Sequence, residues 1–140
     1  MLTMKILRWI AVIPAGLIAA VLVMFPIHWL IMIIAKFGDN LFFTLLSSET
    51  LERLVIAFTT PFFVIYVGTW TAPTHRGEAG LALAIATALI LGGVYVLAFT
   101  GGPMFRGWSS LYFGATPVLN LVGIAIALYN VRRRWGSVAG

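Results

Sequence analysis

The sequence predicts an all-α integral membrane protein, a bundle of four transmembrane helices joined by short loops. Hydrophobic residues make up 61% of the 140 residues and charged residues only 9%, whereas a soluble domain typically carries about 25% charged residues. Four apolar stretches are each close to the length of about 20 residues that a helix needs to cross a bilayer. The basic residues lie mostly at the ends of these stretches, where they would anchor the protein at the membrane surfaces.

A single domain, residues 1–140, is expected to contain all four spans. The predicted spans are about 9–35, 51–71, 79–100 and 111–131.

The first span is marked by two tryptophans. Trp9 and Trp29 are twenty residues apart, or about 30 Å along a helix, which matches the thickness of the hydrocarbon core. The following stretch, about 30–47, is expected either to lie at the membrane interface or to fold back onto the bundle, and the sequence does not decide between these two.

The second span begins with a helix-start pattern. Ser48 is the expected N-cap, and acidic residues follow it in the first turn. Thr59 and Thr60 precede Pro61 near the middle of the span. Because proline has no backbone N–H, we expect these hydroxyls to hydrogen-bond to the carbonyl that proline leaves without a donor.

The third and fourth spans carry small residues at four-residue spacing, which lets a neighbouring helix approach closely in lipid. We expect the rest of the bundle to pack on the face that these residues form in the third span. The predicted packing residues are Gly80, Ala84, Ala88 and Gly92 in the third span, and Gly123 and Ala127 in the fourth.

Basic residues also predict the orientation. With four spans, the N-terminus, the loop at 72–78 and the C-terminus share one side, which holds six basic residues against three on the other. Because basic loops stay in the cytoplasm, we expect both termini to be cytoplasmic in a multi-pass protein of a bacterial cytoplasmic membrane. The six are Lys5, Arg8, Arg76, Arg132, Arg133 and Arg134; the three are Lys36, Arg53 and Arg106.

Polar residues are also predicted near the middle of the membrane. Asn120 lies near the centre of the fourth span, and Thr59, Thr60 and Thr87 lie at similar depth. An amide in hydrocarbon is costly without a partner. The favoured interpretation is an interhelical hydrogen bond that fixes packing, and the alternative is a small polar site at the midplane for a ligand or an ion.

Several kinds of chemistry lack their residues. The chain has no cysteine, no phosphate-binding loop and no nucleophile elbow, and no carboxylate in the interior of a span to relay protons. We therefore expect no cofactor, no bound metal and no catalysis. The net charge of +5 is assigned to contacts with membrane lipids rather than with nucleic acid. His28 with Asp39, Glu49 and Glu52 is the one group with metal-ligand residue types, but it lacks a metal-binding spacing.

The leading functional hypothesis is a non-catalytic structural or accessory subunit that packs against a larger membrane complex or against a second copy of itself. The alternative is a binder of a lipid- or quinone-like small molecule, or a small transporter, that uses the midplane polar residues. A third hypothesis is a membrane enzyme that acts through His28 at the outer interface.

Overall fold

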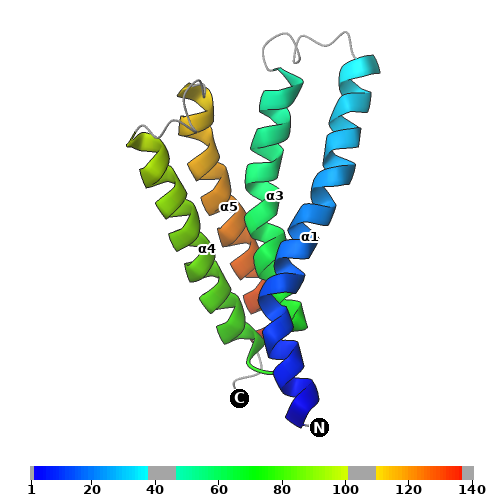
Figure 1. Ribbon diagram of the computed structural model, residues 1–140, viewed down its shortest axis with the longest axis vertical. Coiled ribbons are helices and arrows are strands. Elements are labelled where there is room, and N and C mark those ends of the chain that lie inside the picture. Colours follow the sequence, from blue (N-terminus) through cyan, green and yellow to red (C-terminus); the bar gives the residue numbers. More distant parts are fainter. Residues whose placement is uncertain (1, 38–46, 101–109, 137–140) are drawn as a thin grey trace.

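The computed structural model describes residues 2–37, 47–100 and 110–136, and these form four α-helices (Figure 1). The composition of each helix is apolar enough, and its length sufficient, to cross a membrane. The expected all-helical, four-helix architecture is therefore confirmed. The helices are α1 (Leu2–Phe37), α3 (Ser48–Thr71), α4 (Arg76–Phe99) and α5 (Ser110–Trp135).

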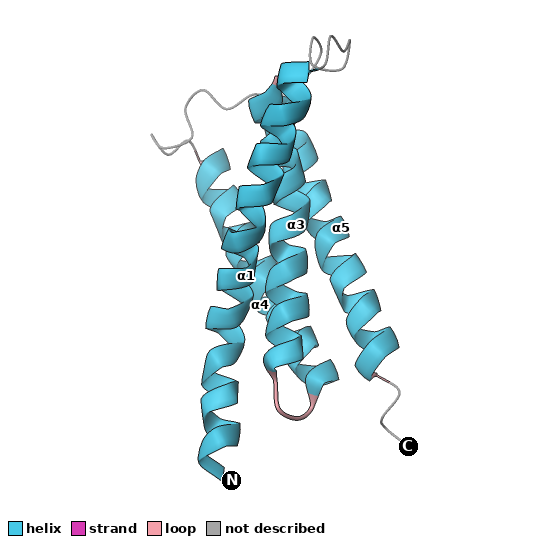
Figure 2. Cartoon of the chain, turned by 90° about the vertical axis from the view of Figure 1, so that its right-hand side faces the viewer, coloured by secondary structure: helices cyan, strands magenta, loops and turns pink. Residues whose placement is uncertain are grey.

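The helices run up and down along one axis. The N-terminus, the C-terminal end of α5 and the connection between α3 and α4 lie at one end of the bundle, as Figures 1 and 2 both show. In Figure 1 the four helices lie closest at this end. Toward the other end, the pair formed by α4 and α5 separates from the pair formed by α1 and α3. The structure thus groups the two ends of the chain on one side, as the four-span arrangement requires.

The bundle is built around α3 rather than around the small-residue face of α4. Helix α3 makes its largest contacts with α1 and α5 and also packs on α4. A Cβ atom added at Gly16 in α1 would lie 2.5 Å from the carbonyl oxygen of Val64 in α3. One added at Gly123 in α5 would overlap the carbonyl oxygen of Phe58 in α3. Glycine is needed at both positions because the facing partner is backbone, which cannot move aside as a side chain can.

The small residues of α4 are only partly used inside the chain. Gly80 and Ala84 are buried, and a Cβ atom at Gly80 would lie 2.7 Å from Cγ1 of Val131 in α5. Ala88 is half-buried, whereas Gly92 has no neighbouring atom within 4 Å of its Cβ position. The face is therefore packed near the start of α4 and open farther along, where α4 and α5 have diverged from α3 (Figure 1).

The hydrophobic core lies near the end that holds the chain termini. On α5, Gly123 is buried and Ala127 is fully buried. The core side chains come from all four helices, and its larger members are Val12, Ile65, Leu83, Ile124 and Val131.

Two local features bear on the expectations from the sequence. The N-cap of α3 is Ser47, one residue before the expected Ser48: its side-chain oxygen accepts a hydrogen bond of 3.2 Å from the backbone N–H of Thr50. Residues 30–37 continue α1 without a break, so this part of the 30–47 segment does not fold back onto the bundle, and its position at the interface stays a prediction. The remainder of that segment, 38–46, lies outside the described residues.

Pro61 is fully buried in α3, and Thr59 does not compensate for its missing N–H. The hydroxyl of Thr59 donates to the carbonyl oxygen of Val55 at 2.9 Å. The carbonyl that Pro61 leaves without a donor is that of Ala57, four residues earlier. The expected hydrogen bond from Thr59 to this carbonyl is therefore wrong. A threonine in a helix can satisfy the hydrogen-bonding capacity of its hydroxyl by donating to the carbonyl four residues earlier.

We predict that Gly123→Ala destabilises the protein, whereas Gly92→Ala does not. The new methyl group at 123 meets the backbone of Phe58 and Cγ of Pro61, 3.1 Å away, and such overpacking typically costs about 1–3 kcal/mol. At Gly92 the added methyl group meets nothing within 4 Å. Thermal unfolding of the detergent-solubilised variants, monitored by size-exclusion chromatography, gives the unfolding midpoints to compare. Equal midpoints would show that α5 does not approach α3 as closely as described.

Candidate functional site

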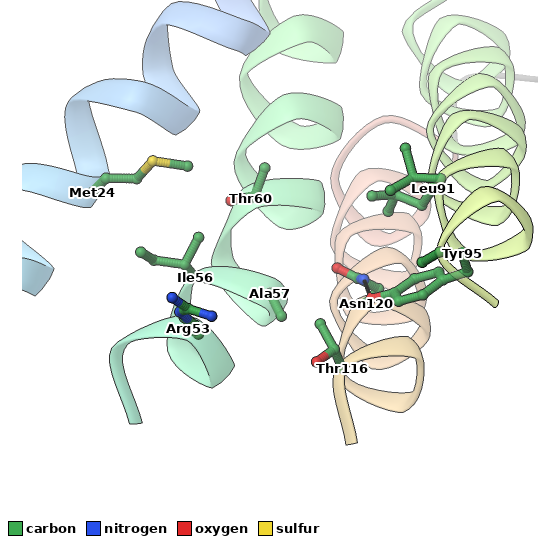
Figure 3. A pocket seen from close by; sticks show the side chains of 11 residues that line it. Met24, Arg53, Ile56, Ala57, Thr60, Leu91, Tyr95, Thr116 and Asn120 are labelled. Carbon is green, nitrogen blue, oxygen red and sulfur yellow. Dashed lines mark hydrogen bonds between the residues drawn. The ribbon is translucent and has the colours of Figure 1, made fainter. Parts of the chain in front are cut away.

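A pocket of about 300 Å³ lies among the four helices, in the half of the bundle where the helix pairs diverge (Figures 1 and 3). We call it the four-helix pocket. Its apolar lining residues are Met24, Ile56, Ala57, Leu91, Val94 and Ala98, and its polar ones are Arg53, Thr60, Tyr95, Thr116 and Asn120. The polar residues come from α3, α4 and α5, so only the folded bundle brings them together.

Asn120 is one of two buried polar side chains of the pocket, with 5% of its surface exposed, against 3% for Thr116. Its Nδ2 donates a hydrogen bond of 2.7 Å to the hydroxyl of Tyr95, which links α5 to α4 (Figure 3). Asn120 therefore has a hydrogen-bond partner on another helix, as expected, and that partner is Tyr95 rather than a threonine. The signal that could have indicated Tyr95 is its hydroxyl, since a buried tyrosine usually finds a hydrogen-bond partner.

Thr60 contributes a polar group without a partner. Its hydroxyl oxygen is buried, and no hydrogen bond to it is found among the residues that the structure describes. Pro61 follows directly and cannot donate to the carbonyl of Ala57, which also lines the pocket. A buried hydroxyl left unsatisfied costs about 1–3 kcal/mol. The α3 wall of the pocket therefore has hydrogen-bonding capacity that the described chain does not use.

The other two predicted polar residues do not line the pocket. Thr59 uses its hydroxyl within α3, as described above, and Thr87 is half-buried on α4 away from the pocket lining. Of the four predicted residues, the structure thus brings Thr60 and Asn120 to one pocket. Residues predicted at the same depth in the membrane can face different directions. Depth determines the position of a residue along the helix axis but not the direction in which its side chain points around that axis.

Arg53 forms one end of the pocket. It lies seven residues before Thr60 on α3, or about 10 Å along the helix axis, and its guanidinium pairs with Glu49 one turn earlier. The pocket therefore has a charged residue at the end near the start of α3 and polar groups on α3, α4 and α5, within a lining that is otherwise apolar. This combination suits a molecule with both polar and apolar parts.

His28 and Glu52 meet beside the start of α3. Nδ1 of His28 lies 2.9 Å from Oε1 of Glu52, which joins α1 to α3 where they begin to separate. Glu49 is held by Arg53, and Asp39 lies outside the described residues. Within the described ranges, no three histidine, cysteine, aspartate or glutamate side chains lie close enough to hold a metal ion.

The comparisons with known proteins give no further assignment: no protein-family model, curated protein or solved structure matches this chain. The fold and the site by themselves define the chain as an up-and-down bundle of four apolar helices with a polar-lined pocket between them.

We predict that Asn120 and Tyr95 are energetically coupled. Interhelical hydrogen bonds of this kind contribute about 0.6 kcal/mol on average and rarely more than about 1.7 kcal/mol. A double-mutant cycle with Asn120→Leu and Tyr95→Phe, measured by unfolding with sodium dodecyl sulfate in mixed micelles, should give a coupling energy in this range. Strictly additive single effects would show that the two side chains do not share the bond.

Proposed function

We propose that the protein is a non-catalytic, multi-pass membrane protein that binds one lipid- or quinone-like molecule in the four-helix pocket. The observation that carries the proposal is the pocket itself, which joins an unpartnered buried hydroxyl of Thr60 to an otherwise largely apolar lining. Ligand sites typically combine a mostly apolar wall with a few polar groups that fix orientation, in volumes of about 300–1,000 Å³.

The membrane setting is supported by the outer surface of the bundle. Large apolar side chains are exposed along α1 and α4, for example Phe25, Leu89 and Ile90, with 62%, 71% and 68% of their surfaces exposed. Soluble monomers rarely expose contiguous apolar surface on this scale. Hydrocarbon chains of a bilayer would cover these faces and would also bring an amphiphilic ligand to the pocket.

The chemistry of the polar lining indicates what the ligand carries. The hydroxyl of Thr60 and the amide N–H groups of Asn120 donate hydrogen bonds, and the second N–H of that amide remains after the bond to Tyr95. A ligand carbonyl, from an ester or a quinone ring, is the acceptor that such donors fit. Binding without transport is the simpler proposal, because none of the four helices carries a carboxylate at its centre.

We predict that filling the pocket releases the ligand. Ala98 lines the pocket and is buried, whereas Ala86 lies on the exposed face of the same helix. The native protein, purified in mild detergent from its own membrane, should retain one lipid-soluble molecule per chain. Ala98→Leu should lose at least nine-tenths of it, and Ala86→Leu should retain it. Organic extraction and mass spectrometry, normalised to protein, give the stoichiometry.

A second variant separates polar recognition from volume. Thr60→Val keeps the side-chain shape but removes the hydroxyl, so affinity for the retained molecule should fall about fivefold, the equivalent of one hydrogen bond of about 1 kcal/mol. Full retention by Ala98→Leu, or a native protein that carries no lipid-soluble molecule, would contradict the proposal.

The second candidate function is an accessory subunit of a larger membrane assembly. It is favoured by the second half of α4, where Gly92 and Gly93 have no atom of the described chain within 4 Å of their Cβ positions, although such residues favour close helix contacts in lipid. A protein partner at fixed stoichiometry in the same purification would support this candidate. A chain that purifies alone would remove it.

We further propose that both termini face the cytoplasm of a bacterial cell. Because the chain has no cysteine, single cysteines report orientation directly. We predict that a membrane-impermeant maleimide labels Thr100→Cys, beyond the end of α4, in intact cells. Thr74→Cys, in the connection between α3 and α4, should react only after permeabilisation. The reverse pattern would invert the orientation, and labelling of both sites in intact cells would exclude a four-span arrangement.

A further inference from the structure

A groove of about 1020 Å³ lies at the end of the bundle that holds the chain termini, away from the four-helix pocket. We call it the terminal groove. It is formed by the connection after α3, the first turn of α4 and the end of α5. The lining residues that matter here are His75, Arg76, Glu78, Leu81, Arg132 and Trp135.

Trp135 organises the basic side chains beside the groove. The Cζ atoms of Arg76 and Arg134 each lie 5.6 Å from the centre of its ring. Nη1 of Arg134 donates to the hydroxyl of Tyr66 at 2.6 Å, and the rings of Tyr66 and Trp135 lie 5.6 Å apart. Residues of α3, α4 and α5 thus place two guanidinium groups against one indole ring, at the surface of the bundle.

The arginines of this cluster have no acidic partner among the residues that the structure describes. No salt bridge among the described residues involves Arg76 or an arginine of 132–134. The nearest acidic residue, Glu78, lies 3.9 Å from Nδ1 of His75.

Of the other three acidic residues of the sequence, Glu49 and Glu52 belong to the start of α3 at the opposite end of the bundle (Figure 1), and Asp39 lies outside the described residues. The arginines of the cluster outnumber the single carboxylate of Glu78, and the resulting net positive charge favours the binding of an anion.

We propose that the terminal groove binds the phosphate of an anionic phospholipid headgroup, with Arg76 and Arg132 as its hydrogen-bond donors. Arginine presents a planar fork of N–H groups that matches phosphate oxygens. Arg132 is exposed and lines the groove, and no hydrogen bond from its guanidinium to the described residues is found.

The groove favours a lipid over free phosphate because Leu81 and Trp135 add an apolar wall, which an inorganic ion would not use. A tryptophan beside basic residues is also typical of the depth at which lipid phosphates lie. The proposal rests on the membrane placement proposed above but not on ligand binding in the four-helix pocket.

The test compares two neighbouring arginines in the full chain. The protein in neutral detergent is titrated with dioctanoyl phosphatidylglycerol and, separately, with dioctanoyl phosphatidylcholine, and bound lipid is counted by native mass spectrometry. The native protein should bind phosphatidylglycerol at least fivefold more tightly than phosphatidylcholine. Arg132→Gln should weaken phosphatidylglycerol binding about fivefold, the usual contribution of one basic residue near a lipid surface. Arg133→Gln carries the same charge change outside the groove lining and should change binding less than twofold.

Three outcomes would overturn the proposal. Equal losses in Arg132→Gln and Arg133→Gln would indicate diffuse attraction to surface charge instead of a site. Inorganic phosphate that competes at the same concentration as phosphatidylglycerol would indicate a site for the free ion. Loss of phosphatidylglycerol binding in Ala98→Leu would place the lipid in the four-helix pocket. Conversely, Ala98→Leu with unchanged phosphatidylglycerol binding keeps the terminal groove even if the four-helix pocket proves empty.

Discussion

The close approach of α1 and α5 to the backbone of α3 is the constraint on which the rest of the bundle depends. Gly16 lies against the carbonyl of Val64, and Gly123 lies against the carbonyl of Phe58. These contacts hold the helices together in the middle of α3 through van der Waals packing, which is the main attraction available between helices where hydrocarbon surrounds them. Toward the start of α3, no glycine of the described helices lies against its backbone in this way. The helix pairs diverge there, and the four-helix pocket lies between them.

Pro61 connects this packing to the chemistry of the pocket. It is fully buried, and its Cγ lies beside Gly123, so it helps to fix α5 on α3. The same residue removes one backbone donor from α3 next to the unpartnered hydroxyl of Thr60. Pro61 thus takes part in the packing contact and directly follows Thr60, which lines the pocket. The contact that stabilises the bundle and the hydroxyl that is available for a ligand therefore lie within one turn of α3.

The charges of the protein are divided between the two ends of the bundle. At the start of α3, acidic residues are paired: Glu49 with Arg53 and Glu52 with His28. At the opposite end, arginines gather around Trp135 with one neighbouring carboxylate, that of Glu78, which lies near His75. Among the described residues, the charges of the first end nearly balance one another, whereas the second end carries an excess of positive charge. This difference has the direction that the distribution of basic loops would give a protein with its termini in the cytoplasm.

The sequence alone determined the four apolar helices, their order and the arrangement that places both ends of the chain together, because apolar length and the positions of breaks and charges are local properties. It also indicated that Asn120 needs a partner, since the cost of a buried amide does not depend on the fold. Only the tertiary structure decided that the partner is Tyr95, that α3 and not α4 is central, and that Gly92 stays unpacked. Those results depend on the rotation and divergence of each helix relative to its neighbours, which arise from contacts between residues far apart in the chain. Spacing along one helix identifies a face but not the helix that will cover it.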